Sequence, residues 1–228
     1  MPATALPPTV LGFLRDLAKH NDRTWFTAQK ARYERDVQQP ALAFIAAMEP
    51  RLRKVSRHVV ADARKMGGSM MRIYRDTRFA KDKRPYKTNL GIQFRHAAGK
   101  DVHAPGLYLH VEPGTVFLGA GLWHPEKEAL RGIRDAIVAS PKSWLAARDH
   151  QPFGTAFELE GDSLKRAPAG IAPDHPMIAD LRRTDFIAVR RLTDRDVSQA
   201  SFADDVAAAF GRATPFMRFL CKAVGVAY

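Results

Sequence analysis

The chain has 228 residues, of which 46% are hydrophobic and 26% charged, and its 36 Lys and Arg against 24 Asp and Glu give a formal net charge of +12. A chain of this length buries enough surface to fold without disulfides or a structural metal. The apolar fraction excludes a disordered protein, and the composition excludes collagen, a coiled coil and a disulfide scaffold.

Helices are expected in the first third of the chain. Leucines at helical spacing predict a helix over residues 11–17. Asn21 and Asp22 form a candidate N-cap for a second helix over residues 23–37. A third helix is expected over residues 41–55, where Pro50 should bend or interrupt it.

The middle of the chain has the period of two that is typical of half-buried antiparallel strands. Leu107, Leu109 and Val111 alternate with polar residues, and the sequence EPGT that follows predicts a turn joining two strands into a hairpin. Strands are expected over residues 71–75, 90–95, 106–112, 115–122, 157–160 and 186–192.

Two further helical regions are expected. A middle helix follows Pro125, and a C-terminal helix covers residues 202–224 with a break at 211–215. Residues 161–176, rich in Gly and Pro, predict a long loop.

This order of elements favours the α+β class. We expect an N-terminal tail over residues 1–9 and a single α+β domain over residues 10–228. Its centre is a mainly antiparallel sheet, with N-terminal helices, a middle helix and a C-terminal helix packed against it.

The positive charge is concentrated in one segment. Residues 51–87 hold thirteen Lys and Arg and three Asp, a net charge of +10, so the rest of the chain carries only +2. Four of these cations, at positions 51, 53, 54 and 57, lie near a predicted helix end, where the helix dipole favours positive charge.

The densest part is residues 72–89, which contain seven basic side chains and two aspartates. No apolar period is visible after residue 75, which predicts a loop, and long loops in compact domains are usually functional or mobile. Asp76 and Asp82 are placed to hold arginines by bidentate pairing. We interpret the segment as a site for an anion. The alternative is a solvated basic loop with internal salt bridges.

The string RIYRDTRFAKDKRPYKTNLG in this segment resembles the signature of the family known as domain of unknown function 2461. PGLYLHVEPGTVFLGAGLWHPEKEALRGIR and the region around LKRAP extend the resemblance over about residues 10–225. Ala80 stands where that family commonly has serine, and Ala169 where lysine is common. The resemblance implies a single-domain protein with the motif loop as its hallmark, and it implies no reaction.

Tyr108, His110 and Glu112 share one face of a predicted strand. His110 as an acid or base, oriented by Glu112, would make this row part of a catalytic site. The alternative is the solvent face of an antiparallel sheet. Trp123 and His124 precede the middle helix, whose N-terminus suits an anion, although the glycines before them are equally consistent with close packing.

The sequence has no HExxH or CxxC spacing and no Walker, GxGxxG or GxSxG motif, so neither a metal nor a cofactor is expected. Cys221, the single cysteine, lies in an apolar helical stretch and is expected to be a buried, inert thiol. No apolar run approaches the ~18 residues of a membrane span, and the N-terminus lacks a signal-peptide pattern. We therefore expect a cytoplasmic protein with no membrane partner.

The favoured hypothesis is a site for an anionic, phosphate-bearing ligand, with phosphoester chemistry if the site is catalytic. The candidate catalytic residues are Asp76, His110 and Glu112. The candidate ligand-binding residues are Arg72, Arg75, Arg78, Lys83, Tyr86, Lys87, Asn89, Trp123 and His124. A second hypothesis is non-sequence-specific nucleic-acid binding by residues 51–87. A third is a scaffold without a ligand, in which the loop pairs with itself.

Overall fold

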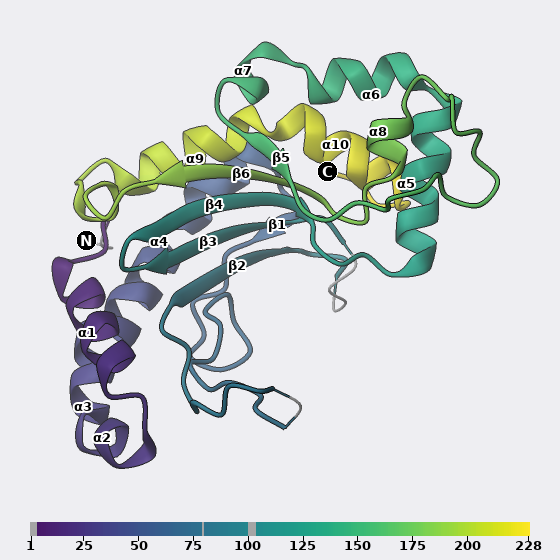
Figure 1. The fold of residues 1–228 in the computed structure, drawn as a ribbon. Coiled ribbons are helices and arrows are strands. Elements are labelled where there is room, and N and C mark those ends of the chain that lie inside the picture. The colour runs from purple at the N-terminus through teal and green to yellow at the C-terminus, as the bar shows by residue number, and fades with distance from the viewer. Residues whose placement is uncertain (1–3, 79, 100–103) are drawn as a thin grey trace.

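The protein is a curved antiparallel sheet with helices along one face and at both ends (Figure 1). The computed structural model describes residues 4–78, 80–99 and 104–228. The six strands follow the order β1-β2-β3-β4-β6-β5. They are β1 (Val59–Val60), β2 (Leu90–His96), β3 (Gly106–Glu112), β4 (Thr115–Leu122), β5 (Glu158–Glu160) and β6 (Phe186–Leu192). The predicted α+β fold with a mainly antiparallel sheet is confirmed.

The helices fall into three groups along the chain. The N-terminal group is α1 (Pro8–Lys19), α2 (Arg23–Ala28), α3 (Lys30–Tyr33), the π-helical turn η1 (Glu34–Gln38) and α4 (Gln39–Val55). The middle group is α5 (Lys127–Ala139), α6 (Pro141–Arg148), α7 (Gln151–Gly154) and α8 (Ile178–Leu181). The 3₁₀ turn η2 (Asp196–Ser198), α9 (Phe202–Arg212) and α10 (Thr214–Ala223) close the chain.

One face of the sheet is apolar and packs against α9 and α10 (Figure 1). Leu107, Leu109 and Val111 of β3 are fully buried and alternate with half-buried residues, as the period of two predicts. Phe94 of β2 meets Phe210 of α9 edge-on, with ring centroids 6.3 Å apart. The polar residues of β3 therefore point to the opposite face, which these two helices leave free.

The first described residues are packed into this core. Leu6 is fully buried, and its N–H donates to the carbonyl of Val197, 2.8 Å away. The carbonyl of Thr4 accepts from the N–H of Ala203 at 2.9 Å. Since α1 begins at Pro8, the boundary predicted after residue 9 falls inside a helix.

Two helix predictions need correction. The single helix expected over residues 23–37 is divided into α2, α3 and η1, because Gln29 leaves the helical conformation at φ −99° and ψ 8°. Pro50 lies inside α4 without interrupting it. Met48 and Leu52 on either side of Pro50 are fully buried, so tertiary packing outweighs the loss of one backbone hydrogen bond.

Gly121 near the end of β4 provides a test of this packing. Its φ is +123°, and a Cβ there would lie 2.0 Å from the carbonyl oxygen of Phe186. We expect Gly121→Ala to lower the free energy of unfolding by more than about 2 kcal/mol, because backbone must move. Gly12, in α1 with no atom within 4 Å of its Cβ position, is the control.

Gly12→Ala is expected to raise the stability by about 0.5–1 kcal/mol, because glycine is unfavourable inside a helix. Urea unfolding of the two variants measures both changes. Equal stability of the two variants would contradict the close approach of β4 to β6.

Candidate functional site

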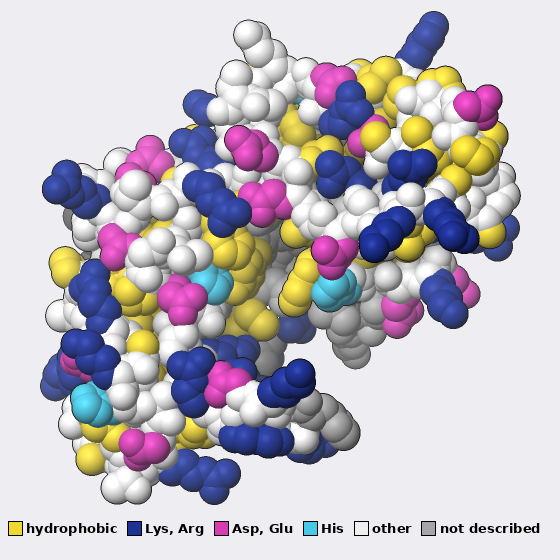
Figure 2. Space-filling model, viewed as in Figure 1, with side chains coloured by type: hydrophobic (Ala, Val, Ile, Leu, Met, Phe, Trp, Pro, Cys, Tyr) yellow, Lys and Arg dark blue, Asp and Glu magenta, His cyan; other side chains and the backbone are white. Residues whose placement is uncertain are grey.

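The basic motif forms a hairpin-like arm on the edge of β2. Residues 69–75 run antiparallel to residues 85–93. The N–H of Lys87 donates to the carbonyl of Ile73 at 2.8 Å, and the N–H of Arg75 donates to that of Pro85 at 2.9 Å. Figure 2 shows a basic arm projecting from the molecule, with a hollow between it and the rest of the surface.

The prediction of a regular strand over residues 71–75 is wrong. The segment makes only isolated bridges, Met70 to Ile92 and Tyr74 to Tyr86, and no named strand. Pro85 explains part of this, since it has no N–H to donate to the facing residue. The tip of the arm is residues 76–84, of which residue 79 lies outside the described residues.

Asn21 fixes the base of the arm to the N-terminal helices. Its side-chain amide donates to the carbonyl of Tyr86 and accepts from the N–H of Tyr86, both at 3.0 Å. The Tyr86 ring is stacked on Phe26 at 4.0 Å between centroids and is only 5% exposed. Tyr86 is therefore an anchor of the arm, whereas Tyr74 beside it is 53% exposed.

The two aspartates of the arm bind three of its arginines. Arg78 makes a bidentate contact with Asp76, at 3.0 Å and 2.7 Å. Asp82 binds both Arg75, at 2.6 Å, and Arg84, at 2.8 Å. These hydrogen bonds lower the pKa of both carboxyl groups, so the aspartates stay ionised at neutral pH.

Lys83 also has a protein acceptor, because its Nζ lies 3.0 Å from the carbonyl oxygen of Thr77. Three of the cations predicted to bind a ligand, Arg75, Arg78 and Lys83, are thus already bonded within the arm. The bidentate pairing expected from the sequence for Asp76 is present.

Arg72 and Lys87 differ from these cations. Within the described residues, neither side chain has a hydrogen-bond or ion-pair partner. Burial, followed by the nearby charge of Arg72, lowers the pKa of Lys87. The two cations therefore interact with each other at the base of the arm, and the charge of Arg72 also contributes to lowering the pKa of Asp76.

The polar row of β3 lies beside this base. His110 Nε2 is 3.4 Å from Glu112 Oε2, and His110 Nδ1 is 3.2 Å from the hydroxyl of Tyr108. The arm adds two groups: the hydroxyl of Thr88 donates to Glu112 Oε1, and Asn89 Nδ2 lies 3.4 Å from His110 Nδ1. The structure thus brings Asn89, His110 and Glu112 together, as the sequence analysis proposed for the last two.

His110 is held in a mostly apolar setting. Its ring is stacked on Phe117 with centroids 4.6 Å apart and planes at 11°. Burial lowers the pKa of His110, against the opposing effect of the hydrogen bond to Glu112. Burial also raises the pKa of Tyr108 to about 12. At neutral pH both groups are uncharged, which leaves His110 Nδ1 as an acceptor when Nε2 donates to Glu112.

Gly91 makes the position of Tyr108 possible. A Cβ at Gly91 would lie 2.8 Å from the hydroxyl of Tyr108 and 3.0 Å from the sulfur of Met71. The absence of a side chain on β2 thus leaves room for the tyrosine to lie across the neighbouring strand.

Trp123 and His124 lie far from the arm. Glu112 faces Thr115 at one end of β4, whereas Trp123 follows Leu122 at the other end, so most of the strand separates the two groups. His124 has a positive φ of 49° and is held by the buried Asp185, which accepts from its N–H at 2.7 Å. The structure does not bring these two predicted ligand residues to the site.

The basic segment of the sequence is also divided in space. The C-terminal end of α4 leads to β1, which pairs with Arg95 and His96 at one end of β2. The arm extends from Leu90 at the other end. The cations of residues 51–57 and those of the arm therefore belong to different parts of the surface.

In residues 4–78, 80–99 and 104–228, no group of three or more His, Cys, Asp or Glu side chains is arranged to hold a metal ion. Over the same residues, no helix is both long and apolar enough to span a bilayer. Cys221 is buried, and burial raises the pKa of its thiol to about 12, so the thiol is unreactive as expected.

Comparison with known proteins gives one match. The family described as conserved hypothetical protein (DUF2461) matches residues 9–219. The chain belongs to the DUF2461 family. No curated protein and no solved structure matches it. The predicted resemblance is confirmed, and membership of the DUF2461 family assigns no activity.

The sequence analysis of this DUF2461 member missed two contacts. Asn21 was interpreted as part of an N-cap, but only Asp22 caps α2, through a bond from the N–H of Trp25. Thr88 was not singled out, although it connects the arm to Glu112. Neither role has a local signal, since 65 residues separate Asn21 from Tyr86 and 24 separate Thr88 from Glu112.

Removing the Asn21 clamp should loosen the arm. Asn21→Ala leaves the N–H and the carbonyl of Tyr86 without partners, and we expect a loss of about 1–2 kcal/mol in unfolding free energy. Faster hydrogen exchange at the Tyr86 amide should accompany it. Asn21→Asp retains the acceptor for that amide, so its exchange should stay slow. Equal exchange in both variants would contradict the clamp.

The setting of His110 predicts a specific titration. Its ring should titrate below the ordinary value of 6.5 in an NMR pH series. Phe117→Ala exposes the ring and should move the pKa toward 6.5, whereas Glu112→Gln removes the opposing carboxylate and should lower the pKa further. Phe117→Leu, which keeps an apolar neighbour, should change it less.

A linked effect on stability follows from the same shift. Between the folded-state pKa and 6.5 the folded protein binds fewer protons at His110 than the unfolded chain does. Stability from this group is therefore present above pH 6.5 and is lost as the pH falls through the folded-state pKa. An unchanged pKa in all three variants would contradict the packing of the ring.

Proposed function

We propose that the protein binds a phosphate-bearing ligand at the base of the arm, next to the polar row of β3. The observation that carries this proposal is the difference between the cations of the arm. Arg75, Arg78 and Arg84 each hold a carboxylate, but Arg72 and Lys87 have none among the described residues. Two neighbouring cations that no carboxylate binds directly favour an anion.

Neutral hydrogen-bonding groups next to these cations support the same ligand. Thr88 and Asn89 follow Lys87 directly in the chain and lie against Glu112 and His110. The charge of Glu112 contributes to raising the pKa of Arg84, which is consistent with the arm lying beside the row. A phosphate held by Arg72 and Lys87 would lie near the hydroxyl of Thr88 and the side-chain amide of Asn89.

If the site is catalytic, phosphoester chemistry with His110 as the base fits the geometry best. A neutral imidazole oriented by a carboxylate is the arrangement that general base catalysis requires. Asp76 fits less well, because Arg78 occupies its carboxylate and lowers its pKa. A cytoplasmic location is part of this proposal, since one cysteine in the chain agrees with a reducing compartment.

Nucleic-acid binding by all of residues 51–87 is less well supported, because the two groups of cations lie at opposite ends of β2. A scaffold without a ligand would explain the paired tip but leaves Arg72 and Lys87 without a role. Both alternatives are outcomes of the experiment below.

Thermal unfolding with phosphate-bearing compounds tests the proposal. Inorganic phosphate, pyrophosphate, sugar phosphates and nucleotides form the panel. A compound present at 100 times its Kd should raise Tm by about 5–10 °C. Arg72→Ala and Lys87→Ala should remove that shift, whereas Lys81→Ala, which removes an exposed cation of the same arm, should retain it.

No shift with any member of the panel would count against the proposal and favour the scaffold. A shift that Lys81→Ala reduces as much as Arg72→Ala would indicate diffuse charge attraction. Duplex DNA binding with a log–log salt slope near 0.9 per neutralised phosphate would favour the nucleic-acid alternative.

A further inference from the structure

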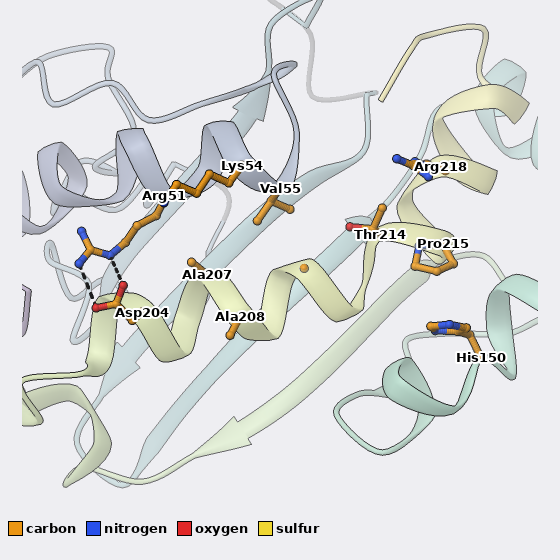
Figure 3. Close-up of a pocket in the computed structure, with 11 residues that line it drawn as sticks. Arg51, Lys54, Val55, His150, Asp204, Ala207, Ala208, Thr214, Pro215 and Arg218 are labelled. Atoms are coloured by element: carbon orange, nitrogen blue, oxygen red, sulfur yellow. Dashed lines mark hydrogen bonds and ion pairs between the residues drawn. The ribbon is translucent and has the colours of Figure 1, made fainter.

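A groove of about 570 Å³ lies among the helices that cover the apolar face of the sheet (Figure 3). Its walls come from the last turns of α4 and from the junction of α9 and α10, with His150 at one end. The arm and the polar row lie beyond the other face of the sheet. The groove is therefore separate from the proposed phosphate site.

Positive charge in the groove exceeds negative charge. Arg51 makes a bidentate pair with Asp204, at 2.8 Å and 3.0 Å, and the charge of Lys54 also contributes to lowering the pKa of Asp204. Lys54 on α4 and Arg218 on α10 have no hydrogen-bond or ion-pair partner in the described part of the chain. Figure 3 shows them on opposite walls, each extending toward the space between the helices.

The floor of the groove is apolar and made of small residues. Ala207, Ala208 and Gly211 line it at the spacing of one helix face, and Val55 and Pro215 complete it. Ala208 is exposed, so this face of α9 is not covered by another element of the chain. The face from Asp204 to Gly211 spans about two helical turns, or ~10 Å. Small side chains there allow another backbone to approach closely.

We propose that this groove binds an amphipathic helix of a partner protein, with carboxylates on the rim of an apolar stripe. The apolar stripe would cover Ala207, Ala208 and Gly211, and the carboxylates would meet Lys54 and Arg218 on the two walls. A nucleic-acid backbone fits less well. It offers no apolar surface to this floor, and its phosphates would lie against the carboxylate of Asp204.

Fluorescence anisotropy with a synthetic peptide tests this interface. The probe is a labelled acidic amphipathic helix of about 18 residues, with Glu on both rims of a Leu and Ala stripe. The full-length protein should bind it at low salt. The same peptide with Lys in place of Glu should not bind.

Charge reversals with matched controls locate the contact. Lys54→Glu and Arg218→Glu should each weaken binding about tenfold. Arg53→Glu and Lys222→Glu place the same change on exposed positions of α4 and α10 outside the groove and should have little effect. Ala208→Trp fills the floor without changing charge and should also abolish binding.

Three results of the peptide-binding experiments would overturn the proposal. They are absence of binding by the acidic peptide, equal losses in the groove variants and the control variants, and retained binding in Ala208→Trp. Self-association of the protein that Lys54→Glu abolishes would identify a second copy of the chain as the occupant and would also reject it. Duplex DNA binding that is lost in Lys54→Glu while peptide binding is absent would reject it in favour of nucleic acid. Arg72→Ala should leave peptide binding unchanged, so the phosphate site can fail independently.

Discussion

The alternation of side chains along β3 and β4 is the constraint on which the rest of the structure depends. Leu107, Leu109 and Val111 must face the helices to form the core, so Tyr108, His110 and Glu112 must face the other way. A shift of one residue in register would bury the polar row. The core therefore determines on which face of the sheet the polar row lies.

Ion pairs within the arm reduce the number of its cations that are available to a ligand. Seven cations in residues 72–87 suggest a strong positive cluster. In the structure, Asp76 and Asp82 pair with three arginines of the arm, Arg75, Arg78 and Arg84. Exposed pairs of this kind contribute little stability. Among the described residues, the pairs leave four cations of the arm without a hydrogen-bonded carboxylate: Arg72, Lys81, Lys83 and Lys87.

Local patterns predicted the fold well, and distant contacts were beyond their reach. The hairpin over residues 106–122 was predicted because its alternation and its EPGT turn lie within one short stretch. The segment 71–75 was mispredicted as a regular strand. Its pairing partners lie on the other side of the arm and form only isolated bridges with it. Trp123 and His124 were grouped with the motif by chemistry alone. The length of β4 separates these two residues from the polar row. This separation depends on the register of β3 and β4, which the local sequence does not show.

Uncompensated cations lower the stability of the fold: Arg72 and Lys87 repel each other, and the burial of Lys87 disfavours its charged form. Carboxylates are available within the same arm, as the tip demonstrates. Lys54 and Arg218 present the same pattern on the other side of the sheet, beside a pair that is complete. In both proposals, aspartates bind neighbouring arginines, Asp76 and Asp82 in the arm and Asp204 in the groove. The cations that we propose to bind anions are left without a hydrogen-bonded carboxylate.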